Sequence, residues 1–467
     1  MFRHLCVDCG AEPPDGFHPF CGRCNGMIDV EYPLAAIRLE DSPDPYVRFA
    51  PLLPLSQGRL PAASYTPLVH ASRLGRRLGL TSLYLKNETV LPTGTTKDRM
   101  GAVSVAYLHE CGVRDFCASS TGNSSTAFAH AIRAFPDMRL YLFTAEQFVT
   151  RVQHAEHAQV RHFGLRDATF VEAAAFAGVY AARHGHASES GFFNPGRREG
   201  LKLAFLEASE QAPRPIDWYV QAVSSAMGVY GAYKGARELH GMGRLARLPR
   251  LLCVQQESCA PMARAFADGA EAIGPQHRVA RPTGIAEAIL RGDPTRAYPH
   301  IRRIVTESGG GFAVVSEVDI REARRLAEDL EGLSPCFSAS AAVAGLIRAA
   351  EDGGGVAPGR ENLLDTDSGS ALSHRTALYR SGDPLAAPEL ATADGSVDAM
   401  GDSQPSDGRR DSCAHCRDSA RQSPRNGGTV SSGTNHCRAF RGMAQESYRD
   451  KCGNEPKCVT LLVWLHL

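Results

Sequence analysis

The sequence has no uninterrupted run of about 18 apolar residues, and no apolar stretch follows Met1, which leads within five residues to Cys6. It also has no excess of either charge, since 51 basic side chains balance 51 acidic ones. The first absence predicts a protein that is neither secreted nor membrane-spanning, and the second gives no support for nucleic-acid binding. We therefore expect a cytoplasmic protein, whose 467 residues suffice for two or three domains with sizeable cores.

Four of the 14 cysteines have a spacing that predicts a metal site. They form two Cys-x-x-Cys pairs that are eleven residues apart, with glycines at the turns: Cys6, Cys9, Cys21 and Cys24, with Gly10, Gly22 and Gly26. This pattern is typical of a zinc ribbon, and in a reducing compartment disulfides are the weaker alternative. Four thiolates complete the coordination of zinc and leave no place for a substrate, so we expect a structural ion. The other alternative is a set of unpatterned thiols.

From about residue 65 to about residue 352, short β-rich runs alternate with helical runs. This alternation predicts an α/β fold with parallel strands and crossover helices. The expected strands are 82–86, 115–119, 139–144, 168–172, 218–223, 251–255 and 312–315. The expected helices include 125–135, 148–162, 200–209, 231–240, 319–331 and 339–350. In such sheets the site lies at the carboxyl ends of the strands, in loops that lead into helices.

Three loops of this kind carry residues suited to chemistry. Lys97 follows a Pro-Thr-Gly turn and begins an apolar helical run, where a lysine can form a Schiff base with an aldehyde cofactor. The loop 119–125 gathers hydroxyls and an amide at a helix start, where they could bind a carboxylate or phosphate. The loop 222–231 leads into a helix whose N-terminus could bind a phosphate monoester. Each alone has an ordinary alternative: a surface lysine, a serine-rich N-cap and a plain strand-to-helix connection.

Together, Lys97, the Thr121-Gly122-Asn123 loop, the loop 224–228 and the cysteine pairs resemble the threonine synthase branch of the fold type II pyridoxal-phosphate (PLP) enzymes, which includes cysteate synthase. The similarity runs from Cys6 to about Ser370. Further matching segments are 65–68, 194–202, 230–235 and 338–346. The resemblance implies an α/β fold like that of the tryptophan synthase β subunit, with two open, parallel-type sheets covered by helices on both faces.

The resemblance also implies a role for each site residue. Lys97 would carry the cofactor and then act as the base that moves the substrate's α-proton. The other implied residues are Asn123 for the cofactor's ring hydroxyl, Ser224, Ser225, Ala226, Met227 and Gly228 for its phosphate, and Thr121, Ser124 and Ser125 for the substrate carboxylate. For the pyridine nitrogen, Thr366 and Asp367 are nearly equal candidates, and Ser368 is a third.

Two departures from the family's pattern leave the reaction open. Ala226 and Met227 occupy a phosphate loop that is normally rich in glycine, and residues 363–369 replace the family's Leu-Thr-Gly turn. We expect elimination and replacement at Cβ or Cγ of a phosphorylated amino acid, either O-phosphohomoserine or O-phosphoserine. Candidate partners for the substrate's anion are Arg99, Lys86, Arg151 and His154. A cysteate synthase-like or specialised-metabolism replacement enzyme is the alternative within this class, and a catalytically inactive ribbon-binding protein is the alternative outside it.

The expected domain order places the zinc ribbon first and a disordered tail last. The segments are a ribbon at 1–30, an arm and the start of the large domain at 31–95, a small α/β domain at 96–200, a large PLP domain at 201–378 and a tail at 379–467. Ser, Gly, Arg, Asp and Asn dominate the tail, and periodicity disappears there. We expect a homodimer that acts on a small-molecule amino acid.

Overall fold

Two β-sheets and an N-terminal ribbon form the fold. The computed structural model describes residues 2–56 and 60–351, together with the backbone of residues 461–466. The larger sheet has the strand order β11 (Gly311–Val315), β10 (Arg250–Gln256), β9 (Trp218–Ala222), β12 (Leu461–His466), β4 (Ser82–Asn87) and β3 (Leu68–His70). The smaller sheet has the order β7 (Val160–Leu165), β6 (Arg139–Ala145), β5 (Asp115–Ser119) and β8 (Ala187–Ser188). The ribbon pairs β1 (Arg3–Cys6) with β2 (Ile28–Glu31) in antiparallel fashion.

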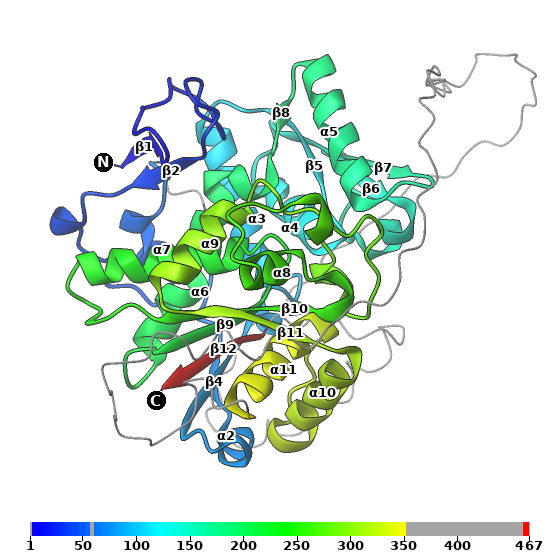
Figure 1. The fold of residues 1–467 in the computed structure, drawn as a ribbon. Coiled ribbons are helices and arrows are strands. Elements are labelled where there is room, and N and C mark those ends of the chain that lie inside the picture. The colour runs from blue at the N-terminus through cyan, green and yellow to red at the C-terminus, as the bar shows by residue number, and fades with distance from the viewer. Residues whose placement is uncertain (1, 57–59, 352–460, 467) are drawn as a thin grey trace, which may run out of the picture. The chain divides into compact units, whose positions relative to one another are not determined.

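Helices connect and cover these strands (Figure 1). The α-helices are α1 (Pro45–Arg48), α2 (Ser72–Leu78), α3 (Lys97–Glu110), α4 (Asn123–Ala131), α5 (Phe170–His184), α6 (Pro195–Gln211), α7 (Met227–Gly241), α8 (Pro261–Ala267), α9 (Tyr298–Glu307), α10 (Glu317–Glu331) and α11 (Phe337–Glu351). The 3-10 helices are η1 (Leu34–Ala36), η2 (Ala50–Leu52), η3 (Glu88–Val90), η4 (Ile132–Ala134), η5 (Glu146–Arg151), η6 (Gly191–Phe193), η7 (Glu257–Cys259), η8 (Pro275–His277) and η9 (Glu287–Ile289). No helix of the described ranges is both long and apolar enough to cross a membrane.

The larger sheet is buried on both faces. In β9, Tyr219 belongs to the core that contains α6 and α7, whereas Trp218 and Val220 belong to the core that contains α10 and α11. Strands β9, β10 and β11 are parallel, which explains why their sequences are apolar on both sides. Strand β3 is antiparallel to β4 and ends the sheet.

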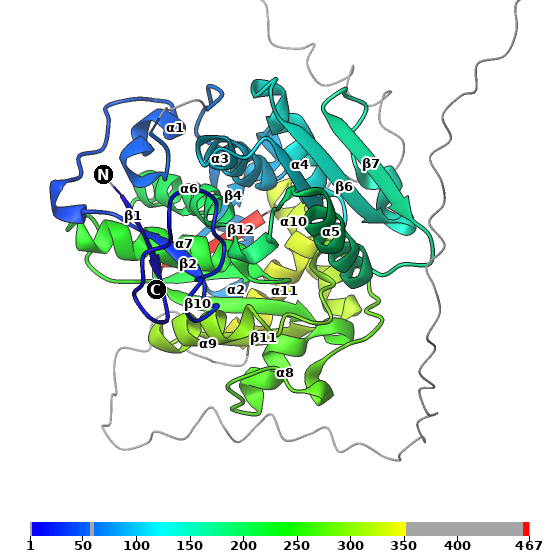
Figure 2. The same ribbon diagram turned by 90° about the horizontal axis from the view of Figure 1, so that it is seen from above.

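The smaller sheet is parallel throughout its four strands. One of its faces packs into the main core through Phe116, Leu140 and Leu142, beside α3 and α4. Its other face, with Cys117 and Phe143, packs against α5. Figure 2 shows α5 and the pair α3 and α4 on opposite sides of these strands. The expected α/β class, with two open sheets covered on both faces, is therefore confirmed.

Two expected elements are wrong. The segment 148–162 is not a helix, because a 3-10 turn (η5) is followed by a loop in which His154 has a φ of 62°, and β7 begins at Val160. The segment 168–172 is not a strand, because α5 begins there with a capping box: the Thr169 side chain accepts from the Glu172 backbone N–H, and the Glu172 side chain accepts from the Thr169 N–H.

Strand β12 lies within the segment 379–467 that was expected to form the tail. Residues 461–466 pair antiparallel with both β4 and β9 and so lie in the interior of the larger sheet (Figure 1). An apolar stretch that the composition placed in a low-complexity region thus supplies backbone partners to two core strands. The residues 352–460, which include the remainder of the tail, lie outside the described part of the chain.

Helix α6 packs so closely against its neighbours that glycine is required at two contacts. A Cβ atom on Gly200 would collide with the Arg99 carbonyl oxygen of α3. A Cβ atom on Gly231 of α7 would lie 2.5 Å from the Arg198 carbonyl oxygen of α6. Since these contacts are with backbone, the helices themselves must move to admit a methyl group. The glycines therefore set the spacing of α3, α6 and α7.

Gly200→Ala is accordingly expected to destabilise the protein by about 1–3 kcal/mol through overpacking. The matched control is Gly178→Ala in α5, where a Cβ atom would meet nothing within 4 Å and alanine improves helix propensity by roughly 0.5–1 kcal/mol. Chemical denaturation of the two variants should give changes of opposite sign. Equal changes in the two free energies of unfolding would contradict the close-packing account.

Candidate active site

A cavity of about 590 Å³ lies where the start of α3, the β5–α4 loop and the β9–α7 loop meet. The wall also includes residues from 288–297, the starts of α5 and α11, residues 188–193, Arg197 and Phe20. The structure brings most of the expected site residues to this cavity: Lys97, Thr121, Asn123, Ser124, Ser224, Ser225, Ala226, Met227 and Gly228. They come from the carboxyl ends of β5 and β9 and from helix starts, as the fold class predicts.

Lys97 is the first residue of α3 and is half-buried at the cavity wall. Its backbone N–H donates to the Thr95 hydroxyl over 3.1 Å. The following residue, Asp98, accepts hydrogen bonds of 2.7 Å from both the N–H and the hydroxyl of Thr93. These bonds tie the turn to the helix and hold the backbone of Lys97 in one place.

Lys97 is also the only cavity-lining lysine in the described ranges. The other lysines there, Lys86, Lys202 and Lys234, each form an ion pair with a buried or nearly buried carboxylate. Lys86 bonds Glu207 over 2.8 Å, for example, with both side chains fully buried. A carbonyl cofactor in the cavity therefore has one lysine within the same cavity to react with.

The β5–α4 loop is organised around Ser120. Its hydroxyl oxygen accepts from the N–H groups of Gly122 and Ser125, over 3.1 and 3.0 Å, and bonds the Ser125 hydroxyl over 2.8 Å. Gly122 has a φ of 135°, a conformation that L side chains rarely adopt. Thr121 and Ser124 line the cavity, whereas Ser125 is fully buried behind its wall and supports Ser120. Ser125 thus lies beside the expected carboxylate site and does not line it.

The β9–α7 loop gives the cavity a helix N-terminus. Ala226 has a φ of 56°, in the left-handed region, and turns the chain so that α7 starts at Met227. Gly228 lies against Gln221, and a Cβ atom there would come within 2.7 Å of the Gln221 amide. Unpaired N–H groups at the start of a helix favour an anion, and this helix start lines the cavity.

Two buried hydroxyls at the cavity wall lack hydrogen-bond partners among the described residues. They are Thr96 Oγ1, beside Lys97, and Ser119 Oγ, at the end of β5. Because a buried unpaired hydroxyl is costly, a polar group in the cavity would be bound favourably there. With the helix start of α7 and Lys97, this wall has the donors that a phosphorylated aldehyde cofactor needs, and so PLP fits it.

Three arginines on the cavity wall were missed as site residues: Arg197, Arg291 and Arg296. Arg197, in the first turn of α6, is 4% exposed, forms an ion pair with Glu189 and donates to Ser124 Oγ over 3.4 Å. Arg291 is far away in the sequence, and no local pattern marked it. By contrast, the expected anion partners Arg99 and Lys86 are fully buried in ion pairs outside the cavity, and Arg151 pairs with Glu287.

Arg291 differs from Arg197 because its charge is not balanced by an ion pair. Its guanidinium forms no ion pair within the described ranges, and its buried Nε atom has no hydrogen-bond partner. The guanidinium carbon lies 5.7 Å from the centre of the Phe170 ring. Burial lowers the pKa of Arg291 below its ordinary value, and the attraction of Asp293 opposes this effect. A guanidinium stays charged at neutral pH, so the cavity has a cation available to an anionic ligand.

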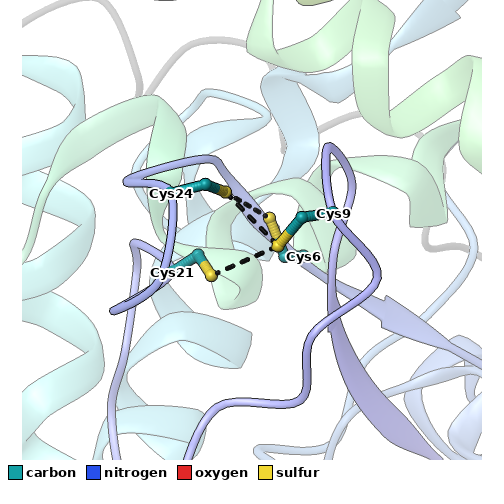
Figure 3. A group of neighbouring side chains, drawn as sticks. All are labelled: Cys6, Cys9, Cys21 and Cys24. Carbon is teal, nitrogen blue, oxygen red and sulfur yellow. Dashed lines mark hydrogen bonds between the residues drawn. The ribbon is translucent and has the colours of Figure 1, made fainter.

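The four expected metal ligands converge on one point (Figure 3). Their sulfur atoms all lie within 4.8 Å of one another, with separations of 3.4 Å for Cys6–Cys24, 3.7 Å for Cys9–Cys21 and 3.4 Å for Cys9–Cys24. A tetrahedral ion with metal–sulfur bonds of about 2.3 Å requires sulfur separations near 3.8 Å. Backbone N–H groups of Cys24 and Arg23 lower the pKa of the Cys21 thiol to about 7, whereas the lowering effect of the Gly26 backbone on Cys24 is outweighed by hydrogen bonds with Cys9 and Cys6, which raise the pKa of the Cys24 thiol. The cluster can therefore hold a metal ion.

The expected partners of the pyridine nitrogen are Thr366, Asp367 and Ser368. They lie outside the described residues, and their role stays a prediction.

Two open α/β sheets, a lysine at a helix start, a hydroxyl loop and a helix start suited to an anion, all at one cavity, are the features of a fold type II PLP enzyme. The Pyridoxal-phosphate dependent enzyme family matches residues 60–361. The chain belongs to this family. Its similarity to threonine synthases and cysteate synthases identifies it as a threonine synthase-like lyase.

Two groups of relatives have similar sequences. The threonine synthase of Methanosarcina acetivorans is 30% identical over 363 residues, which cover 76% of this chain and 88% of that protein. The cysteate synthase of Methanospirillum hungatei is 26% identical over 389 residues, which cover 80% of this chain and 91% of that protein.

Solved structures at lower identity show the same fold. The processed form of threonine deaminase isoform 2 from Solanum lycopersicum has a TM-score of 0.51 at 18% identity and covers 62% of this chain and 80% of that chain. Maize serine racemase has a TM-score of 0.51 at 18% identity and covers 60% of this chain and 80% of that chain.

Proposed function

We propose that the protein catalyses elimination and replacement at Cβ or Cγ of a phosphorylated amino acid, either O-phosphohomoserine or O-phosphoserine. The observation that carries this proposal is the unbalanced positive charge of Arg291 and Arg296 on the cavity wall. In this proposal the helix start of α7 would bind the cofactor phosphate and the hydroxyl loop would bind the substrate carboxylate. The charge of Arg197 is balanced by Glu189, but Arg291 and Arg296 form no ion pair within the described ranges and leave positive charge for a further anion, which a phosphate ester on the substrate side chain would supply.

Bound PLP would supply the electron sink that makes the α-proton of an amino acid removable. Lys97 would carry the cofactor and, once its amino group is released, move that proton. Thr121 and Ser124 would hold the substrate carboxylate by hydroxyl and backbone donors, and Asn123 would hold the cofactor's ring hydroxyl. The N–H groups at residues 224–228 would bind the cofactor phosphate.

The substrate's leaving group would sit near Arg197 and Arg291. The Arg291 guanidinium would stabilise a departing phosphate as its negative charge grows, and Arg197, whose charge Glu189 balances, would add N–H donors. The ion pair with Glu189 orients Arg197, because Glu189 is itself buried at 2% exposure. Because the chain is similar to both threonine synthases and cysteate synthases, the proposal does not specify whether the incoming nucleophile is water or a second anion.

For the cysteine cluster we propose structural zinc. Four thiolates at tetrahedral separations match the preference of zinc for sulfur and leave no open coordination position for a substrate. A cytoplasmic location and a homodimer stay predictions.

A spectral titration tests the function. Purified protein loaded with PLP is expected to show the absorbance of a lysine-bound cofactor, and O-phosphohomoserine or O-phosphoserine should change it at far lower concentration than O-acetylhomoserine or O-acetylserine. Mass analysis of the products then separates replacement at Cβ from replacement at Cγ. Absence of the cofactor band, or no response to either phosphorylated amino acid, would refute the proposal.

Arg291→Met should weaken binding of the phosphorylated substrate about 10- to 100-fold in that titration. The reason is that a hydrogen bond to a charged group contributes about 1.5–3 kcal/mol. Binding of O-acetylserine should change little, since it has no charge on its side chain. The control variant is Arg303→Met, which removes an exposed arginine of α9 outside the cavity wall. Equal weakening of both ligands would show that Arg291 acts on the fold and not on the phosphate.

A further inference from the structure

We propose that the cysteine ribbon forms part of the active-site wall. Metal binding at the ribbon would fix the position of Phe20 and thereby set the width of the cavity rim. The inference rests on the proposed PLP site but requires no particular substrate. It would give the ribbon a role in catalysis without any contact between the metal and the substrate.

The ribbon reaches the cavity through Phe20. This side chain lines the cavity, although it belongs to the segment that carries the metal ligands. Its ring centre lies 4.1 Å from the guanidinium carbon of Arg296 and 4.8 Å from the ring centre of Phe193. Arg296 in turn lies 4.8 Å from the centre of the Phe193 ring, and both also line the cavity. We call Phe20, Phe193 and Arg296 the rim cluster.

Each member of the rim cluster comes from a different part of the chain. Phe193 belongs to η6, directly before the helix that carries Arg197. Arg296 belongs to the segment that carries Arg291. Phe20 therefore touches both segments that hold the proposed phosphate-binding arginines. A guanidinium near two aromatic rings is a favourable contact, so removal of one ring frees the others to move.

Phe20 lies on the second of the two metal-binding turns, which we call the knuckle. Phe20 directly precedes the ligand Cys21, and its backbone forms an isolated β-bridge with Met27. The Cys21 N–H donates to the Gly26 carbonyl over 2.8 Å and closes the turn. The ribbon's own core consists of Cys6, Cys21 and Ile28, with Ala11 packed against them. So small a core cannot hold a fold alone, and a structural metal normally supplies the missing stability.

The rest of the ribbon is held independently of the metal. Asp29 of β2 bonds the Tyr230 hydroxyl over 3.0 Å and forms ion pairs with Arg198 over 3.2 Å and with Lys234 over 3.5 Å. The Ile28 carbonyl accepts a further hydrogen bond from Arg198. Metal loss should therefore leave β2 on helices α6 and α7 and release chiefly the knuckle, with Phe20.

The first test uses the PLP- and zinc-loaded protein. Phe20→Ala and Arg296→Gln should each raise quenching of the cofactor's fluorescence by acrylamide about twofold, and raise the dissociation constant of O-phosphoserine about fivefold, the size of one exposed cation–π contact. Zinc content should stay at one ion per chain. The control is Phe17→Ala, because Phe17 lies in the same ribbon but contacts Tyr107 and does not line the cavity. It should change neither measurement.

The second test removes zinc with a chelator. Wild-type protein should then show the same increase in quenching as Phe20→Ala, and chelation of the Phe20→Ala variant should add nothing further, since both act on one contact. The proposal would be overturned if chelation raised acrylamide quenching equally in the wild-type protein and in the Phe20→Ala variant, or if Phe20→Ala did not change quenching. If the Phe20→Ala variant loses its zinc, the Arg296→Gln variant provides the test of the rim cluster, because it leaves the ribbon sequence intact. Quenching requires only bound cofactor, so it supports or refutes the rim cluster even if no phosphorylated amino acid binds.

Discussion

Lys97→Ala is expected to abolish the absorbance of the bound cofactor and to reduce turnover by a factor of about 10⁴ or more. Two contributions are lost at once: the covalent attachment of PLP and the base that moves the α-proton, which alone accounts for about 10²–10⁴. No other described lysine can take its place, because Lys86, Lys202 and Lys234 are held in ion pairs away from the cavity.

Lys97→Arg is the matched control for charge. Arginine keeps the positive charge at the start of α3 but does not attach the cofactor, so it should be as inactive as alanine. Both variants should keep the wild-type free energy of unfolding within about 0.5 kcal/mol when compared as apoproteins. A cofactor band in Lys97→Ala would show that another lysine carries PLP. The same variant also separates the enzyme from a ribbon-binding protein, since binding through the ribbon would survive it.

Arg99→Met is expected to lower the free energy of unfolding by about 3–5 kcal/mol. Arg99 is 1% exposed and binds two fully buried carboxylates, Glu88 over 2.6 Å and Glu207 over 2.9 Å. Removal of the guanidinium leaves both negative charges buried, and the loss of one partner of a buried pair typically has this effect. Lys86 would remain bound to Glu207 and offset only part of the loss.

Chemical denaturation of the variant against Arg325→Met measures this effect. Arg325 also binds two carboxylates, Glu322 and Asp329, but all three side chains are about half exposed. Its removal should change the free energy of unfolding by less than about 0.5 kcal/mol, because water screens exposed pairs. Similar losses for the two arginines would contradict the account of the buried network.

The network should also weaken in acid. Burial by itself raises the pKa of the Glu88 carboxyl, but the attraction and hydrogen bonds of Arg99 outweigh burial and bring that pKa below its ordinary value. A carboxyl whose pKa is lowered by folding stabilises the protein above its unfolded pKa, near 4.3, and loses this contribution as the pH falls through the folded value.

The prediction of local elements succeeded where the pattern was strong and failed where tertiary pairing decided. The segment 148–162 has residues that favour a helix, yet β7 pairs with β6 along six residues and extends the smaller sheet. Pairing with a neighbouring strand outweighs the small differences in helix propensity. The start of α5 had a readable signal, because Thr169 and Glu172 have the spacing of a capping box.

Other features could not be predicted because they depend on contacts between distant segments. Residues 461–466 read as a short apolar stretch at the end of a polar region, and only their pairing with β4 and β9 makes them a core strand. Arg197 and Arg291 are separated in the sequence by strands β9 and β10, and they line one cavity only after both sheets have formed. The contact of Phe20 with Arg296 has the same origin.

The sequence by itself determined the chemistry that local motifs encode: a lysine at a helix start, a hydroxyl loop, a helix start for phosphate and two cysteine pairs at metal-binding spacing. Such motifs can be read because each depends on residues a few positions apart, whose geometry the backbone alone defines. The tertiary structure decided which cationic side chains line the cavity and which form buried ion pairs elsewhere. It also placed the ribbon at the cavity wall. Those outcomes depend on burial and on long-range packing, which determine whether a charge is paired, solvated or available to a ligand.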